Sequence, residues 1–361
     1  VPAMSLSSVL LGTVCVVCVW WLFRLCVNRF NQSRLRRRAL ADGHCIDRPL
    51  KICVLLGARP KGNTAHLVSE VTQRVQAMHK GPVSVDTIVI SRLRLRQCLG
   101  CERCITGKGC KLADVEQLED VKRRLEACDA FILASPVYVG NVSGTFKTMA
   151  DRYAQWWHRP SLQGKPFLCV VTTGGAWAKK TASLLSHNGY AWGGHYTGMV
   201  LESKMSHKRR VKAQMLGKDY VKEKEVAEFL RCATQPRCMT VPRIVEIYQF
   251  CTMVSMGVIV HRYGPDGAWY RSQGWMDSEG RLSLLYPAGY LPLTHRVVAR
   301  GLQLLYRTVI PAPAMPDDWT LEDTPSVEAH VSVNADPVSP SPVSPPSTYQ
   351  CASGDIEEAL Q

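Results

Sequence analysis

Four cysteines lie within 13 consecutive residues of this 361-residue chain, a spacing at which thiolates can share one metal centre. They are Cys98, Cys101, Cys104 and Cys110, in the pattern C-x2-C-x2-C-x5-C. A tight loop that gathers four thiolates can hold a 4Fe-4S cluster, whereas structural zinc sites usually use two separated pairs of ligands. A structural or redox-active loop without metal is the alternative, and the sequence leaves it open.

A polar segment with two glycines follows an apolar run at residues 52–56. It extends from Gly57 to Thr64 and leads into a helical pattern, so that backbone N–H groups and polar side chains meet at a helix N-terminus. Asn63 stands where a nucleoside triphosphate loop would have Lys, and the dinucleotide spacing G-x-G-x-x-G is absent. The segment therefore favours a terminal monophosphate such as that of FMN, with a ligand-free turn as the alternative. The candidate phosphate-binding residues are Arg59, Lys61, Gly62, Asn63 and Thr64.

Two further segments combine aromatic, polar and glycine residues after apolar runs. The first offers an aromatic face at Tyr138 and an amide at Asn141, and the second allows close backbone approach at two glycines. Together these groups suit the face and the edge of a planar ring. The candidate ring-binding residues are Ser135, Pro136, Val137, Tyr138, Asn141, Thr173, Gly174 and Gly175.

These segments are placed by alternating strand and helix patterns. We expect strands at residues 52–56, 83–90, 130–134, 166–172 and 197–201, and helices at 64–80, 114–127, 143–157 and 218–232. The apolar run at 52–56 is continuous, as in a strand covered on both faces of a parallel sheet. The pattern predicts an α/β fold with a doubly wound, five-stranded parallel sheet, whose ligand crevice lies at the carboxyl ends of the strands.

The N-terminal region has the pattern of a membrane anchor. Residues 1–23 carry no charged side chain, and the apolar stretch at 6–23 is long enough to cross a bilayer. Six arginines follow between residues 24 and 38, an order that argues against a cleaved signal peptide. We expect a single-pass transmembrane helix at 1–30 and a basic linker at 31–50, with the main domain in the cytosol.

The C-terminal region divides into an extension at 239–310 and a tail at 311–361. The extension carries an apolar helix at 247–260 and a basic amphipathic helix at 293–309. These helices can lie on a membrane, pack on the sheet domain or pack across a dimer interface, and we expect a homo-oligomer. The tail is rich in Pro, Ser and acidic residues and should be disordered.

Composition narrows the classes of partner. Hydrophobic residues make up 46% of the chain, enough for a globular core, and the formal net charge is +14. Such a charge suits anionic cofactors or a negatively charged membrane, whereas nucleic-acid binding would rest on charge alone and is not expected. The cysteine cluster differs from a secreted disulfide framework, which favours a reducing compartment.

Several of these motifs resemble one known family. The segment from Gly57 to Thr64, Ser135-Pro-Val-Tyr138, Lys147 with Asp151-Arg152, and the Thr-Gly-Gly sequence ending at Gly175 resemble the flavodoxin-like NAD(P)H-dependent FMN reductases. The cysteine spacing is similar to that of the iron-sulfur flavoproteins in the same broad family. The resemblance implies a flavodoxin-like FMN-binding domain at residues 51–238 and NAD(P)H as substrate. Ala58 replaces the Ser usual in this family, so one phosphate hydrogen bond is either missing or supplied by Arg59 or Lys61.

We therefore expect a membrane-anchored, FMN-dependent oxidoreductase that passes reducing equivalents from NAD(P)H to a quinone or another small acceptor. A flavin carries this chemistry itself, so we name no catalytic acid, base or nucleophile. One alternative is an iron-sulfur flavoprotein that carries electrons between protein partners. The other is a non-catalytic scaffold anchored in a membrane.

Overall fold

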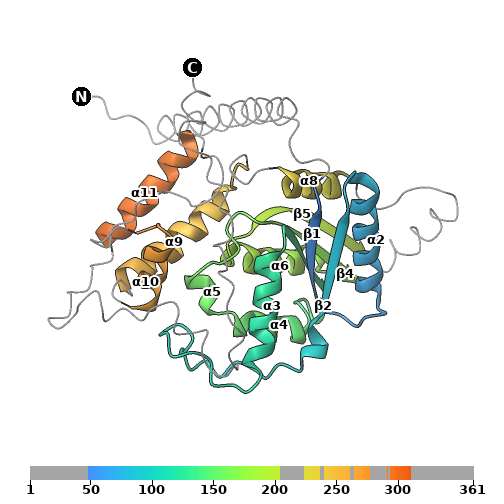
Figure 1. The fold of residues 1–361 in the computed structure, drawn as a ribbon, viewed down its shortest axis with the longest axis horizontal. Helices are drawn as coiled ribbons and strands as arrows, with labels where there is room; N and C mark the ends of the chain where they lie inside the picture. Colours follow the sequence, from blue (N-terminus) through green and yellow to red (C-terminus); the bar gives the residue numbers. More distant parts are fainter. Residues whose placement is uncertain are drawn as a thin grey trace, which may run out of the picture.

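A five-stranded sheet forms the centre of the computed structural model, which describes residues 48–203, 223–235, 240–260, 264–276, 291 and 293–309 (Figure 1). The strands are β1 (Leu50–Leu56), β2 (Val83–Val89), β3 (Ala130–Pro136), β4 (Pro166–Thr173) and β5 (His195–Ser203). Their order is β2-β1-β3-β4-β5 and every neighbouring pair is parallel, which confirms the predicted doubly wound, flavodoxin-like sheet. Parallel strands put their carboxyl ends at one edge, so the segments that follow β1, β3 and β4 meet there.

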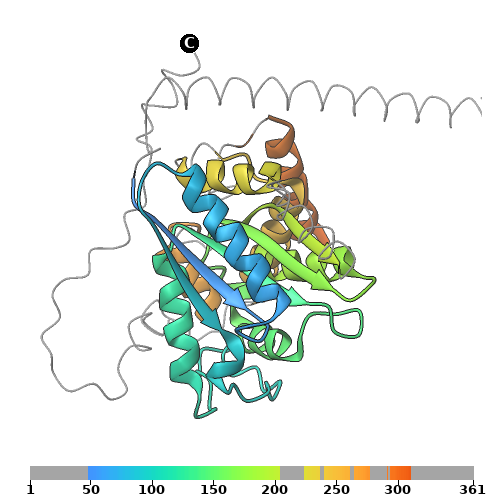
Figure 2. The ribbon, with the colours of Figure 1, turned by 90° about the vertical axis from the view of Figure 1, so that its right-hand side faces the viewer.

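Helices cover both faces of the sheet, as Figures 1 and 2 show. In the sheet domain they are α2 (Asn63–Met78), α3 (Val115–Ala127), α4 (Gly144–Arg152), α5 (Gln155–His158), α6 (Ala178–Ala191) and α8 (Glu223–Thr234), with a short 3-10 helix η1 (Ile90–Leu93). One buried cluster joins the sheet to α3, α4, α5 and α6, and another joins it to α2 and α8. Because apolar side chains pack on both faces, the inner strands are buried along nearly their whole length.

Two helices of the sheet domain differ from the sequence prediction. The single helix expected at 143–157 is broken at Tyr153, which leaves the helical conformation and stacks on Trp156 with ring centroids 4.5 Å apart. Helix α6 was not predicted, although it connects β4 to β5. Its Gly189 packs so closely on Phe167 that a Cβ there would lie 2.3 Å from the ring. Tertiary packing therefore determines the break at Tyr153 and the formation of α6, and the helical periodicity of the sequence does not reveal this packing.

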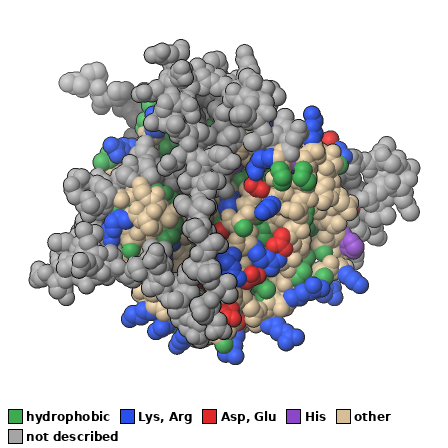
Figure 3. Space-filling model, viewed as in Figure 1, with side chains coloured by type: hydrophobic (Ala, Val, Ile, Leu, Met, Phe, Trp, Pro, Cys, Tyr) green, Lys and Arg blue, Asp and Glu red, His purple; other side chains and the backbone are tan. Residues whose placement is uncertain are grey.

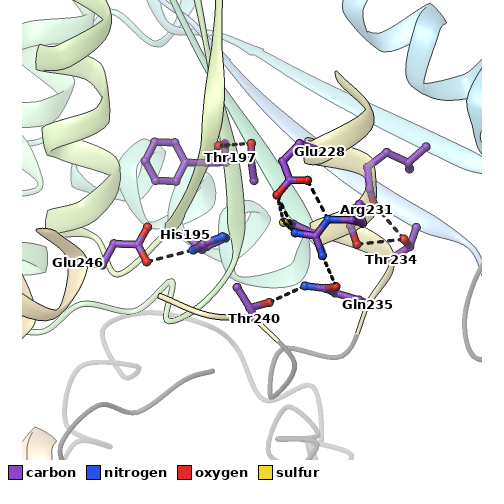
Figure 4. Close-up of polar contacts among 11 residues, drawn as sticks. His195, Thr197, Glu228, Arg231, Thr234, Gln235, Thr240 and Glu246 are labelled. Carbon is purple, nitrogen blue, oxygen red and sulfur yellow. Dashed lines mark hydrogen bonds and ion pairs between the residues drawn. The ribbon is translucent and has the colours of Figure 1, made fainter. Parts of the chain in front are cut away.

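The C-terminal extension packs on the sheet domain. It consists of α9 (Ile244–Val260), α10 (Pro265–Ser272) and α11 (Leu293–Val309), of which α10 was not predicted. Helix α9 contacts α5, α6, α10 and α11, and the extension has its own buried apolar cluster. Glu246 of α9 accepts a hydrogen bond from His195 of β5 (Figure 4). It also accepts one from the Tyr196 N–H. Of the three arrangements considered from the sequence, this one is present in the structure.

Helix α11 exposes part of its apolar side. Leu293, Val297 and Leu304 are 76%, 64% and 54% exposed, while His295 and Gln303 are buried. Within the described ranges, no helix is both long and apolar enough to cross a membrane. The predicted transmembrane segment at 1–30, most of the basic linker and the tail at 311–361 lie outside those ranges.

Candidate functional site

The phosphate loop, residues 57–62, begins with a glycine that serves packing. Gly57 is buried, and its N–H donates to the Ala134 carbonyl at 2.8 Å. A Cβ at Gly57 would lie 2.9 Å from both Phe146 Cβ and Ser143 Oγ. The Gly57 N–H is therefore not available to an anion, because it is bonded to β3.

The backbone N–H groups that can meet an anion lie further along the chain, where α2 begins. Gly62 caps α2 without a side-chain hydrogen bond, and the first turn contains no acidic residue. Asn63 is exposed there, as are Arg59 and Lys61 in the loop before it. The first N–H groups of a helix have no partner within the helix and carry partial positive charge, so this end of α2 attracts an anion.

Thr64 connects two loops instead of pointing outward. It is 2% exposed, and its hydroxyl oxygen lies 2.6 Å from that of Thr172 at the end of β4. Because the Val137 N–H also donates to the Thr172 carbonyl at 2.8 Å, Thr172 holds the segments after β1 and β3 beside the end of its own strand. The structure thus brings the three predicted segments together.

The tyrosine loop, residues 137–143, presents Tyr138 and Asn141 at the surface. Each donates its N–H to the carbonyl of the other, at 2.9 and 3.0 Å, which closes a tight turn. Tyr138 is 53% exposed and Asn141 is exposed, whereas Pro136 and Val137 are half-buried. Ser135 is fully buried, and its hydroxyl accepts from the Ser143 N–H at 2.9 Å. Ser135 therefore supports the loop from below, a correction to its predicted contact with a ring.

The glycine loop, residues 173–177, is shaped by its own threonine. The Thr173 hydroxyl donates to the Ala176 carbonyl at 2.6 Å and accepts from the Gly175 N–H at 3.2 Å. Gly174 and Gly175 are exposed, and a Cβ on either would meet nothing within 4 Å. Neither conformation nor packing within the chain requires glycine at these two positions.

These observations fit FMN. Open space in front of Gly174 and Gly175 would admit the edge of a flat ring, Tyr138 supplies an aromatic face, and the start of α2 supplies donors for a phosphate. One residue next to these groups was not predicted from the sequence. Trp177, at the end of the glycine loop, is a half-exposed tryptophan in the left-handed conformation with a φ of 70°. Neither feature has a signal in the sequence.

The cysteine loop, residues 98–110, lies beyond β2 and η1. Cys98 and Cys101 are exposed, and Cys104 and Cys110 are partly buried. Burial, together with the nearby thiols of Cys98 and Cys110, raises the pKa of Cys104. The donor set suits a cluster chemically, but its placement does not fit: within the part of the chain that the structure describes, no three His, Cys, Asp or Glu side chains are arranged to hold a metal ion.

Two arginines attach the cysteine loop to the sheet domain. The Arg152 side chain is 1% exposed, pairs with Asp114 at 2.8 Å and lies 3.5 Å from the Cys110 sulfur. Arg159 donates to the carbonyls of Cys104 and Ile105. The sequence motif indicated Arg152 but gave no sign of its contact with the cysteine loop.

Positive charge surrounds this edge of the molecule. Lys and Arg side chains gather along the lower edge of the view in Figure 3, where Figure 1 places the cysteine loop and η1. Exposed basic residues in and next to these segments are Arg92, Arg94, Arg96, Lys108 and Lys111. Such a surface attracts anionic ligands toward the carboxyl ends of the strands.

Comparisons with known proteins show what this chain is similar to. The family model described as NADPH-dependent FMN reductase matches residues 50–202. An iron-sulfur flavoprotein of Archaeoglobus fulgidus is 30% identical over 175 residues, which cover 46% of this chain and 77% of that protein. An iron-sulfur flavoprotein of Methanocaldococcus jannaschii is 31% identical over 104 residues, covering 28% of this chain and 51% of that protein. An FMN-dependent NADH-azoreductase of Bacillus anthracis, solved with FMN, has a TM-score of 0.38 at 9% identity and covers 52% of this chain and 98% of its own.

Proposed function

Because this chain belongs to the family of NADPH-dependent FMN reductases and iron-sulfur flavoproteins, FMN-dependent oxidoreductases with NAD(P)H as substrate, we propose that it reduces a quinone or another small acceptor from a membrane surface. The observation that carries the proposal is the convergence of three loops on Thr172, beside a helix N-terminus without a carboxylate. This edge offers donors for a phosphate and open space for a ring.

The phosphate end of the site depends on α2 and the loop before it. Asn63 and the first N–H groups of α2 would donate to a terminal phosphate, and Arg59 and Lys61 would balance its charge. Ala58 has no hydroxyl, so an amide at Asn63 and the two cations replace the contact that serine makes in relatives with that residue. Thr64 contributes through its backbone, because its hydroxyl is held by Thr172.

The ring end of the site depends on the tyrosine and glycine loops. Tyr138 would cover one face of an isoalloxazine, and the absence of side chains at Gly174 and Gly175 would let the backbone approach its edge. When bound, FMN supplies the acceptor for hydride and the donor for the second substrate. The chain then has to bind, orient and polarise the ring, and it needs no side-chain acid or base.

The membrane part of the proposal rests on sequence and on one surface. Residues 1–23 are uncharged and six arginines follow them, as in an anchor whose basic side stays in the cytosol. The exposed Leu293, Val297 and Leu304 of α11 have Arg296 and Arg300 as exposed neighbours, which suits the surface of an anionic bilayer. We further propose that the protein works as a homo-oligomer.

Replacing Asn63 tests the cofactor assignment. Asn63→Ala removes an exposed amide at the start of α2 without touching the core, so the fold should remain intact. Loss of one hydrogen bond to a charged group costs about 1.5–3 kcal/mol, which predicts roughly a tenfold to hundredfold rise in the Kd for FMN. Quenching of flavin fluorescence on titration of the full chain measures this Kd.

Gln76→Ala is the matched control, because Gln76 is exposed on the same helix more than three turns away. It should bind FMN as tightly as the wild type. A wild-type chain that takes up no FMN would overturn the oxidoreductase proposal and leave the scaffold. Equal Kd values for Asn63→Ala and the wild type would remove Asn63 from the phosphate site.

The four-cysteine spacing favours a second function, electron transfer between proteins through an iron-sulfur cluster. This function requires the cysteine loop to draw its thiols closer than they lie in the structure. Iron and acid-labile sulfide in protein purified without air separate the two functions. Flavin without iron supports the reductase, and flavin with about four irons per chain supports the electron carrier.

A further inference from the structure

Trp177 has a backbone conformation that is unfavourable for a tryptophan. It is 50% exposed, and its φ of 70° places a bulky side chain in the left-handed region. Few residues other than Gly, Asn and Asp adopt this region, and strain of this kind concentrates where a protein handles a ligand. Helix α6 begins directly after Trp177, so the strained residue fixes how the glycine loop enters that helix.

The indole of Trp177 lies between two of the loops that form the proposed site. A Cβ on Gly140 would approach Cε3 of Trp177 to 3.1 Å, so the ring lies directly on the turn between Tyr138 and Asn141. That turn is itself unusual, because both Val139 and Gly140 have positive φ values. The hydrogen bonds between Tyr138 and Asn141 impose these values, and the completely exposed Val139 side chain makes no packing contact that would favour them.

Two lysines lie in the first turn of the helix that follows the indole. Lys180 Nζ lies 5.5 Å from the centroid of the Trp177 ring, and Lys179 and Lys180 are both exposed in the first turn of α6. No acidic residue lies in that turn to neutralise them. An aromatic face and two ammonium groups therefore stand together at the rim of the site.

We propose that Trp177, Lys179 and Lys180 form the docking site for the electron donor, a dinucleotide with planar rings and phosphates. The assignment depends on the proposed function, since it concerns the donor of that same reaction. The indole stacks on a ring of the dinucleotide, and the ammonium groups meet its phosphates. Lys180 can leave the indole readily, because a cation–π contact at 5.5 Å between exposed groups is close to the outer limit of about 6 Å.

The test measures donor binding separately from flavin binding. Full-length chain loaded with FMN is mixed with NADPH or NADH under anaerobic conditions, and the rate of flavin bleaching against donor concentration gives the donor Kd. Trp177→Ala should raise this Kd roughly tenfold, and Trp177→Phe should restore most of the affinity. Lys180→Ala should raise it several-fold and weaken its dependence on salt, because one phosphate contact is lost.

Lys80→Ala is the matched control. Lys80 is an exposed lysine in the connection that enters β2, at the opposite edge of the sheet, and its loss should change neither Kd. The Kd for FMN should stay within about twofold of the wild-type value in every variant. Two results would overturn the assignment: an unchanged donor Kd in Trp177→Ala, or a Kd for FMN that rises with it, which would make Trp177 a flavin contact.

A second measurement does not require bound flavin. NADP+ should quench the tryptophan fluorescence of the wild-type chain more than that of Trp177→Phe, with or without FMN. Equal quenching in both would contradict the donor site even if the chain binds no flavin. Failure of FMN to bind would in contrast contradict the reductase proposal and leave this comparison intact.

Discussion

Two glycines that look alike in the sequence have different roles in this site. Gly57 is buried under α4, where no side chain fits, while Gly174 faces open space. From the sequence both look like glycines that approach a ligand. The structure separates them, because one is required by packing within the chain and the other is not.

Replacing each glycine by alanine should therefore give opposite results. A Cβ at Gly57 would lie 2.9 Å from Phe146 Cβ and Ser143 Oγ, so Gly57→Ala should lower the free energy of unfolding by about 1–3 kcal/mol. A Cβ at Gly174 meets nothing, so Gly174→Ala should leave stability within about 0.5 kcal/mol and raise the Kd for FMN. Urea unfolding and flavin titration measure the two effects. Destabilisation by Gly174→Ala would show that the loop is already packed.

Several residues could be predicted as site candidates because their types carry a signal in the sequence. Asn63, Tyr138 and Gly174 stand at the ends of apolar runs, and parallel strands bring those ends to one edge. Ser135 and Thr64 were assigned to a ligand because their hydroxyls are polar, yet both are buried and bonded within the chain. Burial of a small polar group depends on its neighbours in space, which no local pattern contains.

At the scale of elements, the strands were predictable and several helices were not. Strands buried on both faces show as continuous apolar runs, so all five were found within two or three residues of their ends. Helix α6 includes Gly189 and several weak helix formers, and α10 has only eight residues, so tertiary packing determines both. The junction of α9 with β5 also has no local signal, since it joins residues about 50 positions apart.

That junction should make stability depend on pH. Burial alone would lower the pKa of His195, but the carboxylate of Glu246 at 3.0 Å outweighs it, and with the Cys232 side chain of α8 raises this pKa to about 10. The folded chain therefore keeps a proton on His195 that the unfolded chain releases near the usual histidine pKa of about 6.5. The stabilisation is complete below about pH 6.5 and is lost as the pH rises toward 10.

Glu246→Gln tests this dependence. The variant should lose about 3 kcal/mol at pH 6, because it breaks a buried pair, and the difference from the wild type should shrink as the pH rises to 10. Urea unfolding of both chains at pH 6, 8 and 10 gives the difference directly. Glu119→Gln is the control, since Glu119 pairs with Lys122 on α3, away from this junction. A difference that stays constant with pH would show that His195 is neutral in the folded chain.

At the scale of the whole molecule, two buried carboxylates join the extension to the sheet domain. Glu246 holds α9 to β5, and Asp266 of α10, which is 0% exposed, lies 3.0 Å from both His158 Nδ1 and Arg159 Nε. Arg159 in turn donates to the carbonyls of Cys104 and Ile105. The extension, the end of α5 and the cysteine loop therefore form one connected unit.

A close backbone contact reinforces the same connection. Gly107 of the cysteine loop has a φ of 78°, and a Cβ there would lie 2.5 Å from Pro265 at the start of α10. The sequence could not predict this unit, because the pair of Asp266 and His158 spans 108 positions. The consequence is that the cysteine loop should respond to changes in the extension.

Asp266→Asn should expose the cysteine loop. The variant removes the charge that holds Arg159, so Arg159 should loosen its hold on the Cys104 carbonyl, and alkylation of Cys104 should quicken roughly tenfold. Mass spectrometry of peptides after timed alkylation measures each thiol, with buried Cys169 as an unreactive internal reference. Asp151→Asn, which breaks the exposed pair with Lys147, should leave Cys104 unchanged. Glu246→Gln loosens the extension at its other junction, so equal alkylation of Cys104 in Glu246→Gln and Asp266→Asn would mean that Arg159 is not the connection.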